Sequence, residues 1–469
     1  MYNPNLHFHF TGIGGVGMSG IAEVLLRQGF KVSGSDITQN ESCKRLERLG
    51  AVIKVGHARE NLPKAASLLV YSSAVKAENP ELVEAHERQI PVIPRAQVLA
   101  ELMRLKHGIA VAGSHGKTTT TSFIAHILDF AELDPTVVIG GQVKSMGGSG
   151  GKLGKGNFLV AESDESDRSF LLLRPTIAVV TNIDSEHLES YSSMAELEES
   201  FLKFAESVPF YGLAVLCLDD PRLQKISENY SKRKVTYGLT PDADITAKNI
   251  KAGVGFMTYE VWKAGQLLAP VTLPMMGIHM VSNSLAAIAV ALELDVKIEL
   301  IVESLQSFPG VGRRLETIGE IGGITIVSDY GHHPTEIRAT IAALRGSVGA
   351  DKKIYVVFQP HRFSRTKSCF VDFLNAFNEC DDLTISEIYP AGESPIEGVT
   401  GEALYKAMNH HSKHFVSDIK DCRTISKFLK RGDVVLCLGA GSVGMLPFKL
   451  MEDLESGNFE VKSDATKAA

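Results

Sequence analysis

Short apolar runs alternate along the chain with amphipathic stretches and glycine-containing turns. Apolar runs lie at 7–11, 51–54, 68–75, 91–93, 108–113, 157–162, 176–182, 325–329, 354–359 and 433–438, and most precede a stretch with helical spacing. This alternation is typical of an α/β protein with largely parallel sheets. The sequence therefore predicts an α/β fold built from strand–turn–helix units.

Two positions divide this pattern. The helix expected at 95–106 ends in basic residues before His107 and Gly108, and the segment 307–314 is rich in Pro and Gly. A chain of 469 residues has room for roughly three domains. We expect domains at 1–107, 108–309 and 310–469, with a disordered tail after residue 455. The glycine-rich stretch 140–156 is expected to be a mobile loop, and 235–275 a small antiparallel patch.

The first expected strand is followed by Gly12-Ile13-Gly14-Gly15-Val16-Gly17, which fits G-x-G-x-x-G. Glycines at such a turn let backbone N–H groups approach a phosphate at a helix N-terminus. Asp36 follows the second expected strand, where a carboxylate can meet a ribose hydroxyl. The motif alone leaves open NAD, FAD, another nucleotide with a pyrophosphate, or a turn that only packs helix on strand.

A second loop, Gly113-Ser114-His115-Gly116-Lys117-Thr118, also lies between a strand and a helix. Val111 replaces the first glycine of the full phosphate-loop pattern, so this loop is a shorter variant. Its N–H groups and Lys117 predict a nucleoside triphosphate site, with the Thr118 hydroxyl on Mg²⁺.

Acidic and histidine residues follow the next two expected strands. Residues 162–167 read E-S-D-E-S-D, and 181–189 read T-N-I-D-S-E-H-L-E. One carboxylate of the first group can complete a Mg²⁺ shell, and His187 is a candidate metal ligand. The alternatives are a solvated acidic turn and a structural histidine.

The last third carries a different set of polar turns. These are Arg313-Arg314, D-Y-G-H-H-P at 329–334 and Q-P-H-R-F-S-R-T at 359–366. Arginine is suited to a bidentate grip on a carboxylate or a phosphate. An ordinary basic surface is the alternative for these turns.

Composition narrows the functional classes. The net charge is −7, which argues against a general nucleic-acid binder. No apolar run is long enough for a membrane span, and Met1–Phe10 lack the pattern of a secretory signal. The six cysteines are scattered, which favours reduced thiols in a cytoplasmic protein.

Taken together, the motifs resemble those of the Mur ligases of bacterial cell-wall synthesis. The resemblance runs in order from about residue 7 to about residue 446, through G-I-G-G-V-G-M-S-G-I-A, G-S-H-G-K-T-T-T, E-S-D-E-S-D, T-N-I-D-S-E-H-L-E, G-V-G-R-R-L-E, D-Y-G-H-H-P-T-E and Q-P-H-R-F-S-R-T. It implies an N-terminal Rossmann-like domain for the UDP-sugar, a central P-loop ATPase-like domain and a C-terminal Rossmann-like domain for the amino acid.

The resemblance also implies a reaction. An ATP-dependent ligase would join L-alanine to the lactyl carboxylate of UDP-N-acetylmuramate through an acyl phosphate, with ATP and Mg²⁺, as a monomer or weak homodimer. The form E-S-D-E-S-D favours this activity over the related enzyme that re-attaches murein tripeptide. A nicotinamide-dependent dehydrogenase would leave the second loop without a purpose. A nucleotide-switched binding protein would leave the polar turns of the last third unexplained.

Site residues follow from the resemblance position by position. The expected UDP-sugar site comprises Gly12, Gly14, Gly15, Gly17, Ser35, Asp36, His57, Ser73 and Arg95. The expected ATP site comprises Gly113, Ser114, His115, Gly116, Lys117, Thr118, Thr119, His279, Asn283, Arg313 and Asp329. Thr118, Glu162 and His187 are the expected metal ligands, and Tyr330, His332, His361, Arg362 and Arg365 the amino-acid site. The expected catalytic groups are Lys117, Glu162, His187, Arg313 and His332. Glu186 and Ser442 depart from the family's usual Asp.

Overall fold

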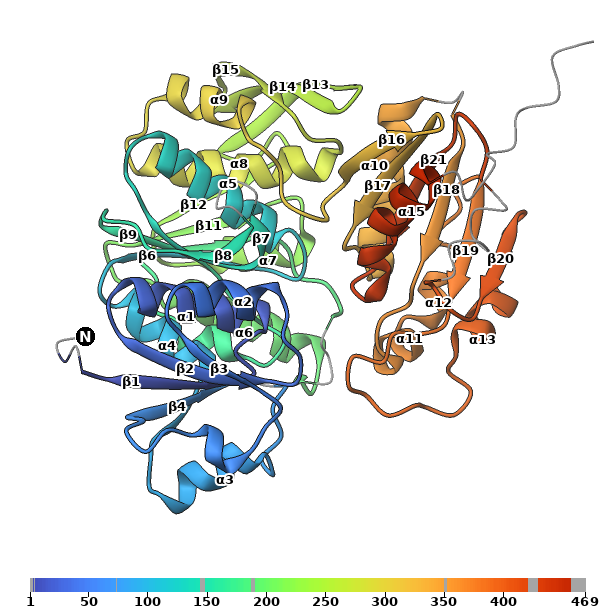
Figure 1. The fold of residues 1–469 in the computed structure, drawn as a ribbon. Coiled ribbons are helices and arrows are strands. Elements are labelled where there is room, and N and C mark those ends of the chain that lie inside the picture. Colours follow the sequence, from blue (N-terminus) through green and yellow to red (C-terminus); the bar gives the residue numbers. More distant parts are fainter. Residues whose placement is uncertain are drawn as a thin grey trace, which may run out of the picture. The chain divides into compact units, whose positions relative to one another are not determined.

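A computed structural model describes residues 3, 5–72, 74–143, 148–186, 190–349, 352–420 and 429–456. It contains three sheets with helices packed against them (Figure 1). Two compact units divide the chain. The first holds residues 1–250, 258–274 and 280–312, and the second holds 251–257, 275–279 and 313–469. The predicted α/β class with three sheet-centred domains is confirmed.

The first sheet is parallel and has the order β3-β2-β1-β4-β5. Chain order reverses beside β1, so the loop after β1 lies at the switch point where such sheets bind ligands. The strands are β1 (His7–Thr11), β2 (Lys31–Asp36), β3 (Val52–Val55), β4 (Leu68–Tyr71) and β5 (Val92–Pro94). The helices are α1 (Val16–Arg27), α2 (Glu41–Arg48), α3 (Pro80–Glu87) and α4 (Arg95–Met103).

The second sheet has the order β15-β14-β13-β12-β11-β10-β6-β9-β7-β8. Its central strands are buried along their whole length, which explains their continuous apolar sequence. The strands are β6 (His107–Ala112), β7 (Thr136–Val143), β8 (Ser149–Lys152), β9 (Phe158–Glu162), β10 (Ile177–Val180), β11 (Leu213–Cys217), β12 (Lys234–Gly238), β13 (Ile245–Gly253), β14 (Phe256–Lys263) and β15 (Gln266–Leu273). The helices are α5 (Lys117–Phe130), α6 (Met194–Glu206), α7 (Pro221–Asn229), α8 (Ile278–Glu293) and α9 (Ile298–Gln306).

Two expectations for this domain need correction. The stretch 140–156 was expected to be a mobile loop, but β7 and β8 form an antiparallel hairpin through it. Its glycines permit close packing, because a Cβ on Gly151 would lie 2.2 Å from the Gly20 carbonyl oxygen of α1. The stretch 235–275 was expected to be a small antiparallel patch, but its strands belong to the central sheet. There β12 pairs in parallel with β11, and β13 pairs in parallel with β12.

The third sheet has the order β16-β17-β21-β18-β19-β20 and is parallel except for β16. Its strands are β16 (Glu316–Ile321), β17 (Ile324–Asp329), β18 (Ile354–Phe358), β19 (Asp382–Ser386), β20 (Lys413–Val416) and β21 (Val434–Leu438). Its helices are α10 (Pro334–Val348), α11 (Phe363–Ser368), α12 (Phe370–Phe373), α13 (Gly401–Ala407) and α15 (Leu446–Glu455). Pro334 opens α10, as predicted.

Three further expectations concern membrane spans, the cysteines and the C-terminal tail. Among the described residues, no helix is long and apolar enough to cross a membrane. Five of the six cysteines are buried and form no disulfide within the described residues: Cys43, Cys217, Cys369, Cys380 and Cys437. Cys422 lies outside the described residues. The tail that was expected to be disordered lies outside them from residue 457 onward.

Candidate active site

The loop between β6 and α5 has the geometry of a phosphate loop. Gly113 and Gly116 have φ values of +139° and +80°, which side chains rarely adopt. A Cβ on Gly113 would lie 1.9 Å from Thr181 Oγ1, and one on Gly116 would lie 2.5 Å from Asn283 Oδ1. Asn283 of α8, one of the expected ATP-site residues, therefore lies against this loop, and Thr119 is buried in the first turn of α5.

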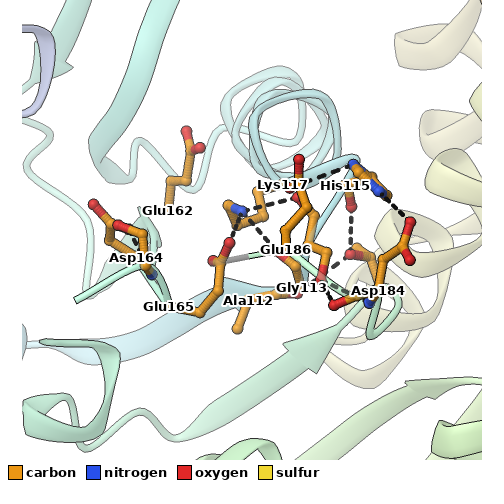
Figure 2. Close-up of polar contacts among 12 residues, drawn as sticks. Ala112, Gly113, His115, Lys117, Glu162, Asp164, Glu165, Asp184 and Glu186 are labelled. Carbon is orange, nitrogen blue, oxygen red and sulfur yellow. Dashed lines mark hydrogen bonds and ion pairs between the residues drawn. The ribbon is translucent and has the colours of Figure 1, made fainter. Parts of the chain in front are cut away.

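Lys117 opens α5 and turns back over the loop (Figure 2). Its Nζ donates to the carbonyl oxygens of Gly113 (2.6 Å) and Ser114 (3.2 Å), and to Glu165 Oε1 (2.7 Å). Burial lowers the pKa of Lys117, but the attraction of Glu165 outweighs it and holds the pKa above the usual value. The ammonium group is thus charged and directed at the loop.

Glu165 is the buried partner of this lysine. It is 2% exposed, and its Oε2 has no hydrogen-bond partner among the described residues. Burial raises the pKa of Glu165 to about 7 even though Lys117 lowers it. One lysine therefore carries nearly all the stabilisation of this carboxylate.

Two oxygen ligands of the expected metal site lie together. Thr118 Oγ1 is 3.0 and 3.1 Å from the two carboxylate oxygens of Glu162, and the Gly140 N–H donates to Glu162 Oε2 at 2.8 Å. A hydroxyl and a carboxylate are hard ligands of the kind that Mg²⁺ prefers. His187, the third expected ligand, lies outside the described residues.

The strand end after β10 fixes the rest of the loop. Asn182 Oδ1 accepts from the His115 N–H (2.8 Å), and Ser114 Oγ accepts from the Asp184 N–H (2.8 Å). His115 Nε2 is 2.9 Å from Asp184 Oδ2. Figure 2 shows Glu186 on the other side of the His115 ring, at 3.8 Å from Nδ1. Asp184 and Glu186, both from the segment T-N-I-D-S-E-H-L-E, therefore lie on either side of the His115 ring.

The loop after β1 is held without any basic side chain of its own. The Gly14 N–H donates to Asp36 Oδ2 at 2.9 Å, and Asn40 Nδ2 donates to the Gly14 carbonyl at 3.0 Å. Gly12 has a φ of +82°. Beside the loop, Ser35 Oγ is 2.9 Å from His57 Nδ1. The structure brings together these expected UDP-sugar residues, whereas Ser73 lies outside the described residues.

A cavity of about 300 Å³ joins the two loops. Arg95 lines it and donates to Asp164 Oδ2 at 3.0 Å, which ties α4 to the acidic turn after β9. Gly17 approaches Arg95 so closely that a Cβ would lie 2.3 Å from its Nη1. The lining comprises Gly15, Val16, Gly17, Met18, Ser72, Arg95, Lys117, Val138, Ile139, Gly140, Glu162, Ser163 and Asp164.

All five residues of the expected amino-acid site lie in the second unit. The rings of His332 and His361 lie 5.9 Å apart, and Arg365 Nη1 is 3.3 Å from His361 Nδ1. Burial, aided by Arg365 and Arg362, lowers the pKa of His361 to about 4, so this ring is neutral at pH 7. Tyr330 packs edge-on against His332 at 5.5 Å. The backbone of Arg362 has a φ of +70°, and its Nε has no partner among the described residues.

The expected ATP contacts of the last domain have structural partners in this unit. Arg313 donates to the Gly439 carbonyl and lies 4.8 Å from the Tyr330 ring centroid. Asp329 is 4% exposed and accepts from the N–H groups of Leu315 (2.8 Å) and Gly331 (2.7 Å). His279 is half-buried, and its partial burial together with Arg314 lowers its pKa to about 4.

Sequence reasoning missed three buried or capping carboxylates. Glu81 of α3 accepts from Thr11 and Ser35, and Glu165 accepts from Lys117. Glu336 of α10 accepts from the His332 N–H at 3.0 Å and forms a capping box with His333. The signal for Glu336 was available in H-P-T-E, which places an acid three residues after the N-cap. Glu81 and Glu165 carry no comparable sequence signal.

Three family models match the chain in order. The Mur ligase family catalytic domain matches residues 7–107, the Mur ligase middle domain matches 111–291, and the Mur ligase glutamate ligase domain matches 313–441. The chain belongs to the Mur ligase family, as its motifs predicted. It is an ATP-dependent ligase that forms amide bonds.

Comparison with similar proteins indicates which kind of amide-forming ligase this chain resembles. Relatives named UDP-N-acetylmuramate–L-alanine ligase include one from Geotalea daltonii, 52% identical over 97% of this chain and 99% of its own, and one from Geobacter sp. (strain M21), 53% identical over 94% and 96%. The crystal structure of a UDP-N-acetylmuramate–alanine ligase from Thermotoga maritima is 28% identical, with a TM-score of 0.84 over 97% of this chain and 100% of that chain. A murein peptide ligase from Psychrobacter arcticus, 23% identical with a TM-score of 0.73 over 98% and 100%, shares the fold.

Proposed function

We propose that this chain uses ATP to join L-alanine to the lactyl carboxylate of UDP-N-acetylmuramate. Relatives about half identical over nearly the whole chain are named UDP-N-acetylmuramate–L-alanine ligase, and this name confirms the predicted pair of substrates. The residue roles below, the acyl phosphate and the use of Mg²⁺ are the further content of the proposal.

The observation that carries the residue roles is the shared cavity. The loop after β1 and the Lys117 loop line one space of about 300 Å³. A UDP-sugar held by its diphosphate at the first loop can extend its carboxylate toward the triphosphate at the second. Two separate pockets would not support transfer between the two substrates.

The first step is phosphoryl transfer. A carboxylate oxygen of the muramyl group attacks the γ-phosphorus of ATP, the bond from that phosphorus to the bridging oxygen breaks, and ADP leaves. Lys117 holds positive charge where the transferring phosphoryl oxygens lie. Thr118 and Glu162 would hold Mg²⁺, which supplies further positive charge at the phosphates when bound.

The second step forms the amide. The amine of L-alanine attacks the acyl carbon, inorganic phosphate leaves, and the amine loses a proton. Arg365 has the planar fork that grips a carboxylate, and the neutral His361 beside it can accept a hydrogen bond. We assign alanine's carboxylate to this cluster of Tyr330, His332, His361 and Arg365.

The test measures release of inorganic phosphate from ATP with each substrate omitted in turn. Release that requires both UDP-N-acetylmuramate and L-alanine is expected, with the amide product seen by mass spectrometry. A panel of glycine, L-serine and murein tripeptide replaces alanine in parallel reactions. Faster turnover with the tripeptide would support the recycling activity instead, and phosphate release without any amino acid would contradict ligation.

A further inference from the structure

Glu81 is a fully buried carboxylate beneath the expected UDP pocket. It has 0% exposure and accepts from four side chains: Thr11 (2.8 Å), Ser35 (2.7 Å) and His9 (3.3 Å) to Oε2, and Asn61 (2.9 Å) to Oε1. Burial raises its pKa, but these hydrogen bonds outweigh burial and lower the pKa to about 2. Glu81 is therefore an anion and can only accept hydrogen bonds.

Because the Glu81 carboxylate can only accept, Ser35 must donate the hydrogen bond between them. A serine hydroxyl has a single proton, and the Ser35 proton goes to Glu81 Oε2 at 2.7 Å. Ser35 Oγ also lies 2.9 Å from His57 Nδ1. Since Ser35 has no second proton to give, it must accept in that contact, and Nδ1 must carry the hydrogen.

A second acceptor supports the same assignment. His57 Nδ1 also faces Glu81 Oε1 at 3.6 Å. An unprotonated Nδ1 would place its lone pair against those of Ser35 and Glu81, three acceptors without a proton between them. With the proton on Nδ1, the Nε2 atom of the neutral ring carries a lone pair.

The far side of the ring is open. The His57 side chain is 19% exposed, and no partner for Nε2 occurs among the described residues. His57 follows β3 at the carboxyl edge of the first sheet, next to Asp36 at the end of β2. In sheets of this type the carboxylate at the end of β2 meets the ribose of a bound nucleotide. The base is attached to that ribose, so we place it beside Asp36 and His57. His57 Nε2 is thus an acceptor at the expected base position.

We propose that the Glu81–Ser35–His57 chain holds His57 as the Nδ1–H tautomer, so that Nε2 accepts from the imide N3–H of uracil and selects uridine over cytidine nucleotides. This inference rests on the proposed placement of the UDP-sugar in the first domain. Cytosine has a lone pair at N3, which would meet the lone pair of Nε2. Glu81 acts through Ser35 and His57 and is a positioning residue.

Base selection is tested by calorimetry on the full chain with UDP, CDP and 3-methyl-UDP. UDP should bind roughly ten- to a hundredfold more tightly than CDP or 3-methyl-UDP. Neither of these has an N3–H to donate, so His57 Nε2 would be left as a buried acceptor without a hydrogen bond. His57→Ala and Glu81→Gln should each bring the UDP-to-CDP ratio close to one. Glu84→Gln, on the same helix and paired at the surface with Arg59, should keep the ratio of the unsubstituted chain.

The tautomer is measured in the unsubstituted chain, and a variant serves only to assign the signal. In ¹⁵N-histidine-labelled protein, long-range ¹H–¹⁵N correlations distinguish Nδ1–H from Nε2–H, and the His57→Ala spectrum assigns the signal. An Nδ1–H ring supports the proposal, and an Nε2–H or doubly protonated ring overturns it. UDP binding without base selection overturns this inference alone, whereas failure to bind any of the three nucleotides also overturns the proposed placement of the UDP-sugar.

Discussion

Two glycine loops in one compact unit use the same backbone chemistry for different tasks. Gly12–Gly17 leads from β1 into α1, and Gly113–Gly116 leads from β6 into α5. Each places backbone N–H groups at a helix N-terminus. Asp36 already occupies the Gly14 N–H of the first loop, whereas Lys117 adds a positive charge to the second. The first loop suits a diphosphate that is only held, and the second suits a phosphate on which charge develops.

The buried carboxylates beside the two loops, Glu81 and Glu165, differ in the number of side chains that donate hydrogen bonds to them. Glu81 has four side-chain donors and a pKa lowered to about 2, whereas Glu165 has Lys117 and a pKa raised to about 7. Both are at most 2% exposed, so the number of donors rather than burial sets the charge. Glu81 is a fixed part of a rigid pocket, and Glu165 holds a lysine that must turn to a phosphate.

The largest expected effect is at the second loop. Lys117→Met should lower kcat by about 10²- to 10³-fold or more, because the charge acts on the transferring phosphoryl group. The dissociation constant for UDP-N-acetylmuramate, measured by calorimetry, should stay unchanged. Lys155→Met removes an exposed lysine of the same domain and serves as the control. Loss of UDP-sugar binding in Lys117→Met would contradict the division of tasks between the loops.

Glu162→Gln should lower turnover by about 10²-fold while the fold is retained, since one metal-binding oxygen becomes an amide nitrogen. The Mg²⁺ concentration for half-maximal activity should rise, as measured by titration of the phosphate-release rate. Asp167→Asn, in the same turn but exposed, is the matched control. An unchanged Mg²⁺ dependence in Glu162→Gln would remove this residue from the metal site.

At the first loop, Gly14→Val should abolish binding of UDP-N-acetylmuramate and spare ATP. A Cβ there would lie 2.8 Å from Asn40 Nδ2 and Cys43 Sγ, so the loop must shift and backbone approach is blocked. Gly346→Val adds the same bulk at an exposed helix position where a Cβ meets nothing within 4 Å. Unchanged binding of UDP-N-acetylmuramate in Gly14→Val would contradict the proposed placement of the UDP-sugar at this loop.

The sequence predicts the loops well because their chemistry is local. The strand β6, the glycine turn and the helix α5 are contiguous between His107 and Phe130, and the predicted α/β class and ligase family are confirmed. The domain limits and site residues remain predictions. The hairpin in 140–156 was missed because a glycine-rich stretch favours a loop. Its strands are stabilised by packing on α1, a contact that the local sequence does not show.

The two buried carboxylates could not be predicted for a related reason. Glu81 meets Thr11, Ser35 and Asn61 from three other segments, so only the folded sheet brings its donors together. Glu165 stands in an acidic run where every carboxylate looks alike in sequence, but burial singles it out from its exposed neighbour Asp167. Structural and exposed acids differ here in burial, which depends on contacts between distant segments, and not in residue type.

The smallest expected effect separates the two carboxylates by the pH dependence of stability. The folded pKa of Glu165, about 7, lies above the ordinary value of 4.5, so its contribution to stability is present at low pH and is lost as pH rises through 7. Replacing it by Gln should therefore become more favourable relative to the unsubstituted chain by about 2 kcal/mol from pH 5.5 to pH 8, or roughly 4 °C in melting temperature.

The folded pKa of Glu81, about 2, lies below the ordinary value, and its contribution is lost only as pH falls below about 4.5. Glu81→Gln should then lower the melting temperature by the same amount at pH 5.5 and at pH 8. Scanning fluorimetry of both variants and of Glu84→Gln across this range measures the difference, and parallel pH profiles for Glu81→Gln and Glu165→Gln would mean that the two buried acids carry the same charge.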